Sequence, residues 1–388
     1  VSILRKDTLS LTYLCHQLTQ KKLLAESSKN GTLEYAFAHE RIKDIVSQRQ
    51  SESGRRILHL RVAQYLEEGL KDNKTPPYDL LRHHYALGGD RFKTFQYQVL
   101  ALNAYAGFCY ELLPTLTADP DSEAQGHEGL TAYFQTLETE LNSLRHTTFG
   151  EFRPELKRLE MILLHTEGRY CIHDGLYSRG LEILQRLLEH CWESGDWYLS
   201  VQAHLQFIYY GIQTFCTQVM EEHLDIVKNL LWGKEHSGEY GIYLRLSGLL
   251  CVMEGRYEEA RALLNRSIQT FLALDSNRNG KYAINIAGVY NYMAESYRLE
   301  GNYCSAFHYY DQAISYNRSR GYYPGAAVIY TNYGVAAYQN GQVLEARQLF
   351  RYAVEIYTDS HEYSEYPIAL SYLALYDAQE QNYSKAAE

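Results

Sequence analysis

The C-terminal part of the sequence repeats one pattern of small and large residues, in residues 243–267, 290–314, 330–354 and 370–388. In each copy a small residue stands seven positions before a turn position, and an alanine stands five positions after that turn. The small residues are Gly248, Ala294, Gly334 and Ala374, the turn positions Gly255, Gly301, Gly341 and Gln381, and the alanines Ala260, Ala306, Ala346 and Ala386. Such self-similarity restricts the chain to a stack of similar units, each packing on its neighbours.

Each copy predicts a pair of antiparallel helices. Small residues let the two helices approach closely, and glycine accepts the backbone geometry of a tight turn. Large residues fill the space between pairs; they are Tyr257, Tyr303, Val343 and Tyr383 after the turn and Leu264, Tyr310 and Phe350 beyond the alanine. The pattern resembles the tetratricopeptide repeat, with turns farther apart than the roughly 34 residues of the standard unit. With weaker copies around Gly168 and Gly211, we expect five or six hairpins in an α-α superhelix.

The first seventy residues follow a different pattern. Residues 9–24 have leucines at helical spacing, and the dipeptide Asn30-Gly31 predicts a β-turn between two short strands. Residues 40–48 and 55–70 then predict two helices. Helices around a small hairpin indicate a winged-helix-like domain.

These patterns divide the chain into three parts within a predominantly all-α fold. Residues 1–70 form the winged-helix-like domain, and residues 71–150 form a leading helical hairpin that turns at residues 88–90. A flexible surface loop is expected at 114–129, where proline, glycine and acidic residues occur without periodicity. The tetratricopeptide-like array occupies residues 151–388.

Bulk properties favour a protein partner. The 388 residues are 46% hydrophobic and carry a formal charge of −10, which disfavours nucleic acid and anionic membranes. The seven cysteines stand singly, as expected for reduced core thiols, and no apolar run is long enough to span a membrane. We expect a cytoplasmic protein. Because the chain begins at Val1 and ends within a helical pattern, we interpret it as a segment of a longer one.

No catalytic motif is present in the sequence. It has no GxxxxGK[ST] phosphate loop, no HExxH and no GxSxG element. His83 and His84 have no cysteine or second histidine pair close in sequence, so we interpret them as structural. The chain is therefore predicted to be non-catalytic, with no metal and no cofactor of its own.

The order of three segments near the N-terminus carries a second resemblance. "YAFAHERIKDIV" at 35–46 is followed by "LHLRVAQYLEEGL" at 58–70 and "LLRHHYALGGD" at 80–90. This order resembles the region after the ATPase core of STAND-type signalling ATPases, whose winged-helix domain carries a Phe-x-His-Asp element. The resemblance covers roughly residues 5 to 110, and such proteins commonly continue into tetratricopeptide arrays. It implies signal transduction with an upstream ATPase domain, ATP or ADP in the full-length protein, and an output such as transcription regulation.

His39 matches the family histidine, which lies near the β-phosphate of bound ADP and holds the closed state. Glu40 stands where the family has aspartate, which keeps the charge but lengthens the side chain. A histidine at a helix N-terminus suits an anion, and the window 39–61 carries a local excess of arginine and lysine. The alternative is that His39 only caps the helix against Phe37 while the basic residues form a solvated face. Nucleic-acid binding by this segment is not favoured.

The superhelix predicts a groove lined by the first helix of each hairpin. Its expected exposed residues are Arg245, Leu249, Asn291, Glu295, Arg298, Thr331, Val335, Tyr338, Ser371 and Leu375. Their mixed polarity suits a protein, a peptide or a small inducer. The first hypothesis is therefore a regulatory sensor segment that couples groove binding to the ATPase and output domains. The alternative is a stand-alone tetratricopeptide adaptor for protein assembly.

Overall fold

The computed structural model describes residues 8–29, 32–69, 77–109, 130–147, 153–275, 282–318, 324–360 and 366–380. Within these ranges it contains seventeen helices and one two-stranded sheet, which confirms the predominantly all-α, tetratricopeptide-like architecture. The chain forms two compact units, residues 1–102 with 128–159 and residues 103–127 with 160–388. The three-part division expected from the sequence stays a prediction. No helix in the described ranges is long and apolar enough to cross a membrane.

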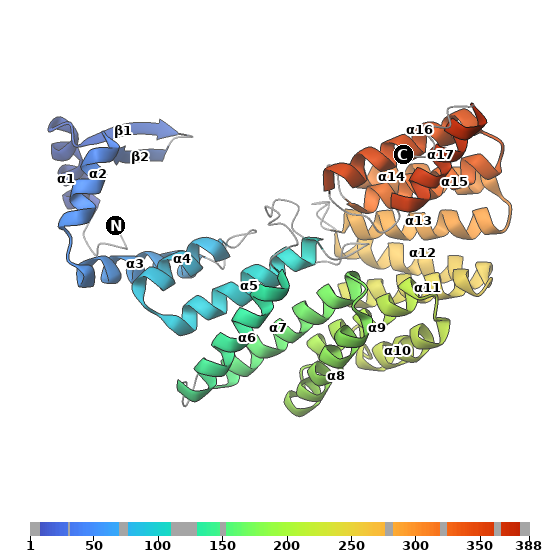
Figure 1. Ribbon diagram of the computed structural model, residues 1–388, viewed down its shortest axis with the longest axis horizontal. Coiled ribbons are helices and arrows are strands. Elements are labelled where there is room, and N and C mark those ends of the chain that lie inside the picture. Colours follow the sequence, from blue (N-terminus) through green and yellow to red (C-terminus); the bar gives the residue numbers. More distant parts are fainter. Residues whose placement is uncertain are drawn as a thin grey trace. The chain divides into compact units, whose positions relative to one another are not determined.

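The N-terminal unit begins with a helix, a β-hairpin and two further helices. Helix α1 (Thr8–Gln20) precedes strands β1 (Leu24–Lys29) and β2 (Thr32–Phe37), and α2 (Glu40–Arg49) and α3 (Glu52–Glu68) follow. The strands lie side by side in Figure 1 and pair antiparallel, from Leu24 opposite Phe37 to Lys29 opposite Thr32. The predicted helices and strands are confirmed, whereas the Asn30-Gly31 turn lies outside the described residues. The winged-helix assignment stays a prediction.

The same unit continues with three further helices and contains a small hydrophobic core. Helices α4 (Tyr78–Gly88), α5 (Arg91–Cys109) and α6 (Leu130–Thr147) follow α3. The predicted turn at 88–90 is confirmed, with Gly89 at φ 83° ending α4. Ala63 of α3 packs with Leu81 and Tyr85 of α4 in this core. The loop expected at 114–129 lies outside the described residues.

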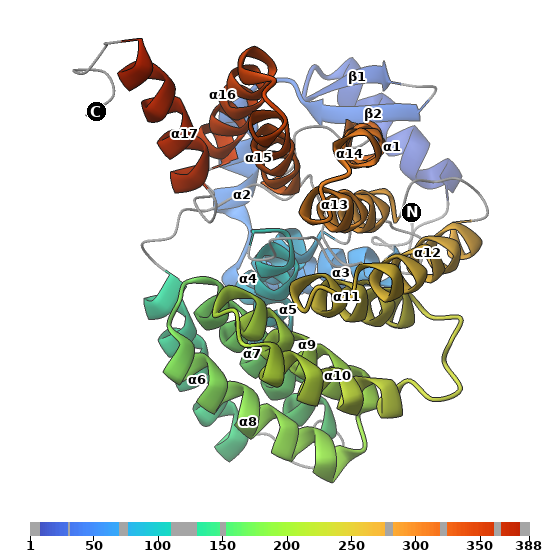
Figure 2. The same ribbon diagram turned by 90° about the vertical axis from the view of Figure 1, so that its right-hand side faces the viewer.

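The second unit is a succession of antiparallel helix pairs, which Figures 1 and 2 show side by side for α13 with α14 and for α15 with α16. Its helices are α7 (Arg153–His173), α8 (Tyr177–Ser194), α9 (Trp197–Gln213), α10 (Thr217–Leu230), α11 (Gly238–Met253), α12 (Tyr257–Leu274), α13 (Ala283–Leu299), α14 (Tyr303–Arg318), α15 (Pro324–Gln339), α16 (Val343–Ser360) and α17 (Tyr366–Gln379). The pairs α9 with α10, α11 with α12, α13 with α14 and α15 with α16 are the hairpins of the array.

Small residues sit where the two helices of a pair cross. A Cβ added at Gly248 would lie 2.7 Å from the Leu264 side chain, and one added at Gly334 would lie 2.7 Å from Phe350. The turn glycines Gly255, Gly301 and Gly341 have φ of 76°, 82° and 81°. The alanines after the turns, Ala260, Ala306 and Ala346, are completely buried. The predicted roles of small residues in close helix packing and in the turns are confirmed for the first three copies. Gln381 and Ala386 of the fourth copy lie outside the described residues.

Aromatic side chains fill space both within a helix pair and between successive pairs. The rings of Tyr310 and Tyr333 stack with centroids 5.0 Å apart, and those of Tyr297 and Tyr309 stack at 5.4 Å. Tyr310 is completely buried in the core of helices α13 to α17. Stacked rings add specific geometry to the burial of their apolar area. The abundant tyrosines therefore serve the packing of the array.

Candidate functional site

His39 lies at the start of α2, where its backbone caps the helix. Its carbonyl oxygen accepts hydrogen bonds from the N–H groups of Ile42 at 3.0 Å and Lys43 at 3.4 Å. The side chains of His39 and Glu40 are both exposed. The histidine therefore fulfils the capping role through its backbone and leaves its imidazole open to solvent. A nucleotide-sensing role for His39 and Glu40 stays a prediction.

The surface around His39 is apolar as well as basic. Phe37 is 42% exposed, and Ile45 and Val46 of α2 are 47% and 41% exposed. Among residues 10–62 whose burial the structure describes, no side chain is buried. Contiguous exposed apolar patches of more than a few hundred Å² often mark surfaces that contact another molecule or domain. We name Phe37, Ile45 and Val46 the α2 apolar surface.

Three residues expected to face the groove are buried, which makes the predicted exposure wrong for them. Arg245 and Thr331 are completely buried, and Asn291 is 1% exposed. The Thr331 hydroxyl donates to the Ala327 carbonyl within its own helix, and Asn291 accepts a hydrogen bond from Asn332 of α15. Contacts between neighbouring first helices cover these positions. Whether they bind a partner stays untested.

Glu295 and Arg298 neutralise each other. The guanidinium donates from Nε at 2.9 Å to one carboxylate oxygen of Glu295 and from a terminal nitrogen at 2.7 Å to the other. Arg298 also donates to Gln339, and the hydroxyl of Tyr310 donates to Glu295. Burial together with the charge of Glu295 raises the pKa of Tyr310 well above its usual value, which keeps the hydroxyl protonated. This network holds α13 to α14 and α15 and leaves little free capacity for a ligand.

The remaining groove candidates are more accessible. Ser371 of α17 is exposed, and Leu375 is 41% exposed. Tyr338 is half-buried and meets Tyr372 edge to face, with ring centroids 5.2 Å apart. Leu249 and Val335 are also half-buried. These side chains are accessible to a partner, and their role in a binding groove stays a prediction.

Arg245 is completely buried, and its charge has no acidic partner in the described part of the chain. Its guanidinium donates to the Tyr209 hydroxyl of α9 at 3.2 Å and to the Asn285 amide oxygen of α13 at 3.3 Å. Its Nε has no acceptor, and the buried amide nitrogen of Gln206 on α9 also has none. Both neighbours of the guanidinium are neutral. A position in the repeat pattern identified Arg245 from sequence, but not its burial.

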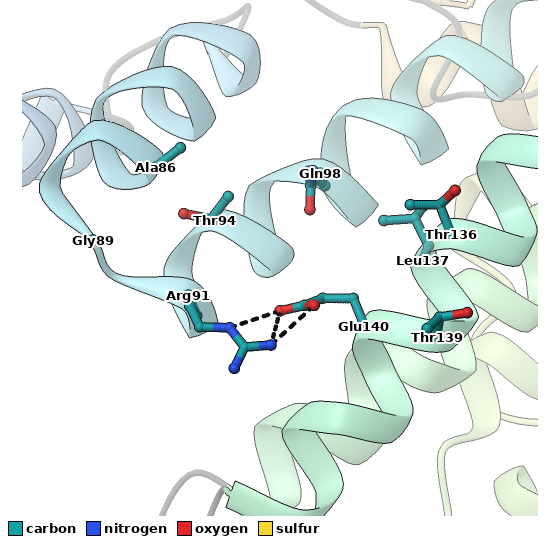
Figure 3. Close-up of a pocket in the computed structure, with 9 residues that line it drawn as sticks. All are labelled: Ala86, Gly89, Arg91, Thr94, Gln98, Thr136, Leu137, Thr139 and Glu140. Carbon is teal, nitrogen blue, oxygen red and sulfur yellow. Dashed lines mark hydrogen bonds and ion pairs between the residues drawn. The ribbon is translucent and has the colours of Figure 1, made fainter.

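A pocket of about 540 Å³, lined by polar and apolar groups, lies in the N-terminal unit between the start of α5 and α6. Figure 3 shows Arg91 facing Glu140 across it, with nitrogen-to-oxygen distances of 2.9 to 3.1 Å. The hydroxyls of Thr136 and Thr139 donate to carbonyls of their own helix. The charges and hydroxyls of the pocket are therefore already paired. No motif in the sequence predicted a pocket at this place.

A third histidine, from α3, joins His83 and His84 in space, and their interpretation as structural residues stays a prediction. His59 of α3 places its Nδ1 2.9 Å from Nδ1 of His84, and the His83 ring meets that of His84 edge to face. Burial and the neighbouring histidines lower the pKa of His59 and of His84. No group of three metal-binding side chains with suitable geometry occurs in the described residues. The helical periodicity of residues 55–70 and 78–88 was the sequence signal that would have placed His59 beside His84.

Comparisons with known proteins agree with this architecture. Residues 285–359 match the tetratricopeptide repeat family model. No curated protein matches the sequence. A signal transduction ATPase with numerous domains (STAND) protein with a tetratricopeptide repeat sensor, from Pyrococcus horikoshii, is similar over 99% of this chain, with a TM-score of 0.56 and 14% identity. The likeness covers 52% of that protein, so the chain spans about half its length. Yeast Tom70 is also similar, with a TM-score of 0.28 and 15% identity over 84% of this chain and 86% of its own.

The fold of the chain is therefore that of a tetratricopeptide-like repeat protein. The likeness to the STAND protein, at 14% identity, bears on the fold alone.

Proposed function

We propose that this chain is the regulatory, non-catalytic segment of a multidomain signal-transduction protein of the STAND type. Its repeat array binds a protein, a peptide or a small inducer, and residues 8–68 pack against a nucleotide-binding ATPase domain. The mechanism is a shift between a closed and an open arrangement, driven by the difference in ligand affinity between them. The coarser part of the proposal, a repeat protein that binds other proteins, rests on the tetratricopeptide match of residues 285–359.

The observation that carries the proposal is the α2 apolar surface beside an exposed His39. A domain that packs against no other domain would bury Phe37, Ile45 and Val46 in its own core. Full burial of each such apolar side chain stabilises the folded state by about 1.5–3 kcal/mol. A covering ATPase domain buries these residues and brings a nucleotide phosphate near the imidazole. The similarity to a STAND protein along 99% of the chain supports the same arrangement.

The proposal is tested in the complete reading frame. We expect it to encode a phosphate-loop ATPase upstream of Val1. In the purified complete protein, the double substitution Phe37→Ser with Ile45→Ser is expected to accelerate the release of bound ADP, because it weakens the contact that holds the closed state. The matched control is Leu344→Ser, which replaces a side chain that is 84% exposed on the repeat array.

A reading frame without an ATPase domain would contradict the proposal. ADP release that is equally fast in the double variant and in the control would also contradict it. Either result would favour a stand-alone repeat adaptor.

A further inference from the structure

Arg245 carries a buried positive charge that nothing in the described chain neutralises. The residue is completely buried on α11, and its two hydrogen-bond acceptors, Tyr209 and Asn285, are neutral. Burying an ionised group is costly unless an opposite charge or a full set of hydrogen bonds compensates it. Other partly buried arginines of the array meet a carboxylate: Arg261 meets Glu300 at 3.0 Å, and Arg347 meets Asp377 at 3.0 Å.

The environment of Arg245 offers further donors and no acidic acceptor. Its Nε has no hydrogen-bond partner, and neither has the Nε2 of Gln206, which is 2% exposed. Gln206 lies one helical turn before Tyr209 on α9, and residues three apart in a helix share a face. The Tyr209 hydroxyl bonds to Arg245, so this face of α9 is directed at α11. Two buried donors, one of them charged, are thus left without acceptors.

Unsatisfied buried polar groups are uncommon in native structures and each requires a physical reason. Sites at which a chain breaks the ordinary packing rules are often functional, because stability is sacrificed there for binding. An anion would satisfy both requirements here. Its charge would compensate the guanidinium, and its oxygens would accept from Arg245 and Gln206, since a planar guanidinium matches the geometry of carboxylate and phosphate groups.

We propose that Arg245, with Gln206, receives the carboxylate or phosphate group of a small anionic ligand held between α9, α11 and α13. This proposal rests on the ligand-binding role proposed for the array, and it narrows the chemistry of the inducer. The two hydrogen bonds that now occupy the guanidinium are at 3.2 and 3.3 Å, the long end of the usual range, and come from neutral groups. An ionised acceptor forms shorter and stronger bonds and displaces them.

The proposal is tested with two probes on the full chain, succinate for the carboxylate and inorganic phosphate for the phosphate. Calorimetric titration and thermal unfolding are measured at constant ionic strength set with sodium chloride. We expect at least one probe to bind and to raise the melting temperature. Binding of succinate alone identifies a carboxylate ligand, and binding of phosphate alone identifies a phosphate ligand. Absence of binding by both probes overturns the proposal.

Substitutions identify the residue that receives the anion. Arg245→Met is expected to weaken probe binding on the order of 10- to 100-fold, which is the effect of losing a charge-assisted bidentate contact. Arg245→Lys keeps the positive charge but lacks the bidentate donors of the guanidinium, so it is expected to lose less affinity than Arg245→Met. Gln206→Leu is expected to lose less affinity than Arg245→Lys, because it removes only one neutral donor. Arg261→Met is the control, since this arginine is already paired with Glu300. Equal binding by Arg245→Met and the unmodified chain overturns the proposal.

The stability of the ligand-free variants separates a binding residue from a structural one. Because replacement of an uncompensated buried charge by an apolar side chain of similar volume is often neutral or stabilising, we expect Arg245→Met to melt at or above the temperature of the unmodified chain. Arg261→Met is expected to melt lower. A large loss of stability in Arg245→Met would show that Arg245 stabilises the fold, and it would contradict the proposal. These measurements need no ATPase domain, so they fail independently of the ADP-release experiment.

Discussion

Glycine residues of the repeats serve two distinct purposes. Gly248 and Gly334 lie where a side chain would collide with a large residue of the second helix. Gly255 and Gly341 instead have positive φ and open space around them. The first pair is required by packing, and the second pair is required by backbone conformation. The same residue type therefore predicts different responses to substitution.

Replacement of Gly334 by alanine is expected to destabilise the chain by about 1–3 kcal/mol, because the new Cβ forces Phe350 out of its site in a well-packed core. Gly341→Asn is the control, since asparagine tolerates the left-handed conformation better than other side chains. It is expected to cost clearly less. Urea unfolding followed by circular dichroism measures both. Equal losses for the two variants would show that close helix approach at Gly334 is not what the repeat requires.

The sequence pattern located the groove residues but not their burial. Periodicity assigns Arg245, Asn291 and Thr331 to first helices, and the structure places them there. Their burial arises because neighbouring first helices contact one another, as the bond from Asn332 to Asn291 shows. Such contacts depend on the spacing of successive repeats, which here exceeds the standard unit. A pattern within one repeat carries no information about that spacing.

Paired histidines join the two helices of a hairpin at two places. Nδ1 of His204 on α9 lies 2.8 Å from Nδ1 of His223 on α10, and His59 and His84 form the same contact between α3 and α4. The His223 ring also stacks on Phe207, with centroids 4.3 Å apart. A hydrogen bond between two imidazoles needs one ring to accept, so at least one ring must be neutral.

Stability is expected to fall in mild acid because of the α9–α10 pair. Burial, with the charge of His223, lowers the pKa of His204 from 6.5 to about 4. A histidine whose folded-state pKa is depressed binds protons more readily when unfolded, so its stabilising effect is complete above pH 6.5 and is lost as the pH falls toward 4. The loss amounts to about 3 kcal/mol at most. Thermal unfolding of the full chain between pH 7.5 and 5 measures it.

His204→Gln removes the titrating group and supplies the control for this prediction. The variant is expected to show a shallower decline of melting temperature with acid than the unmodified chain. Glu222 favours the charged form of His223 and reduces the contribution of the partner ring. An identical decline in both proteins would exclude the α9–α10 histidine pair as its source.

The N-terminal elements were largely predictable because their signals are local. The Asn30-Gly31 dipeptide between alternating residues predicted the hairpin, and leucine spacing predicted α1. The packing of these elements was not predictable, because residues 10–62 contain no buried side chain among those whose burial the structure describes. Ala63 of α3 is the first buried residue from the N-terminus among the residues whose burial the structure describes.

Exposure of the α2 apolar surface predicts that this chain tolerates polar substitutions there. Phe37→Ser with Ile45→Ser is expected to change the free energy of unfolding by about 0.5 kcal/mol per site or less, as for other surface changes. Leu81→Ala, at a completely buried position, is expected to cost about 2–5 kcal/mol. Chemical denaturation compares the two. A loss of similar size in both would show that the α2 apolar surface is part of the fold rather than a contact for another domain.

At the scale of the whole molecule, net charge and repeat architecture both favour a role in binding other proteins or ligands rather than nucleic acid. A formal charge of −10 disfavours nucleic acid as a partner of the chain. The repeats supply a large surface of mixed polarity, and the N-terminal elements supply an apolar surface beside an exposed histidine. A segment built in this way suits a role between a ligand and a second folded domain. The repeat pattern predicted the array, whereas the second domain is proposed from the order of the N-terminal motifs and from the exposed α2 apolar surface.

The most direct test of the coupling role is the rate of ADP release from the complete protein with and without the imidazole of His39. His39→Ala is compared with His236→Ala, which removes an exposed histidine elsewhere in the chain. If His39 contacts the bound nucleotide, its loss removes a hydrogen bond to a phosphate and accelerates release on the order of 10-fold or more. The account predicts fast release in His39→Ala and an unchanged rate in His236→Ala. Equal rates in both variants and the unmodified protein would contradict it.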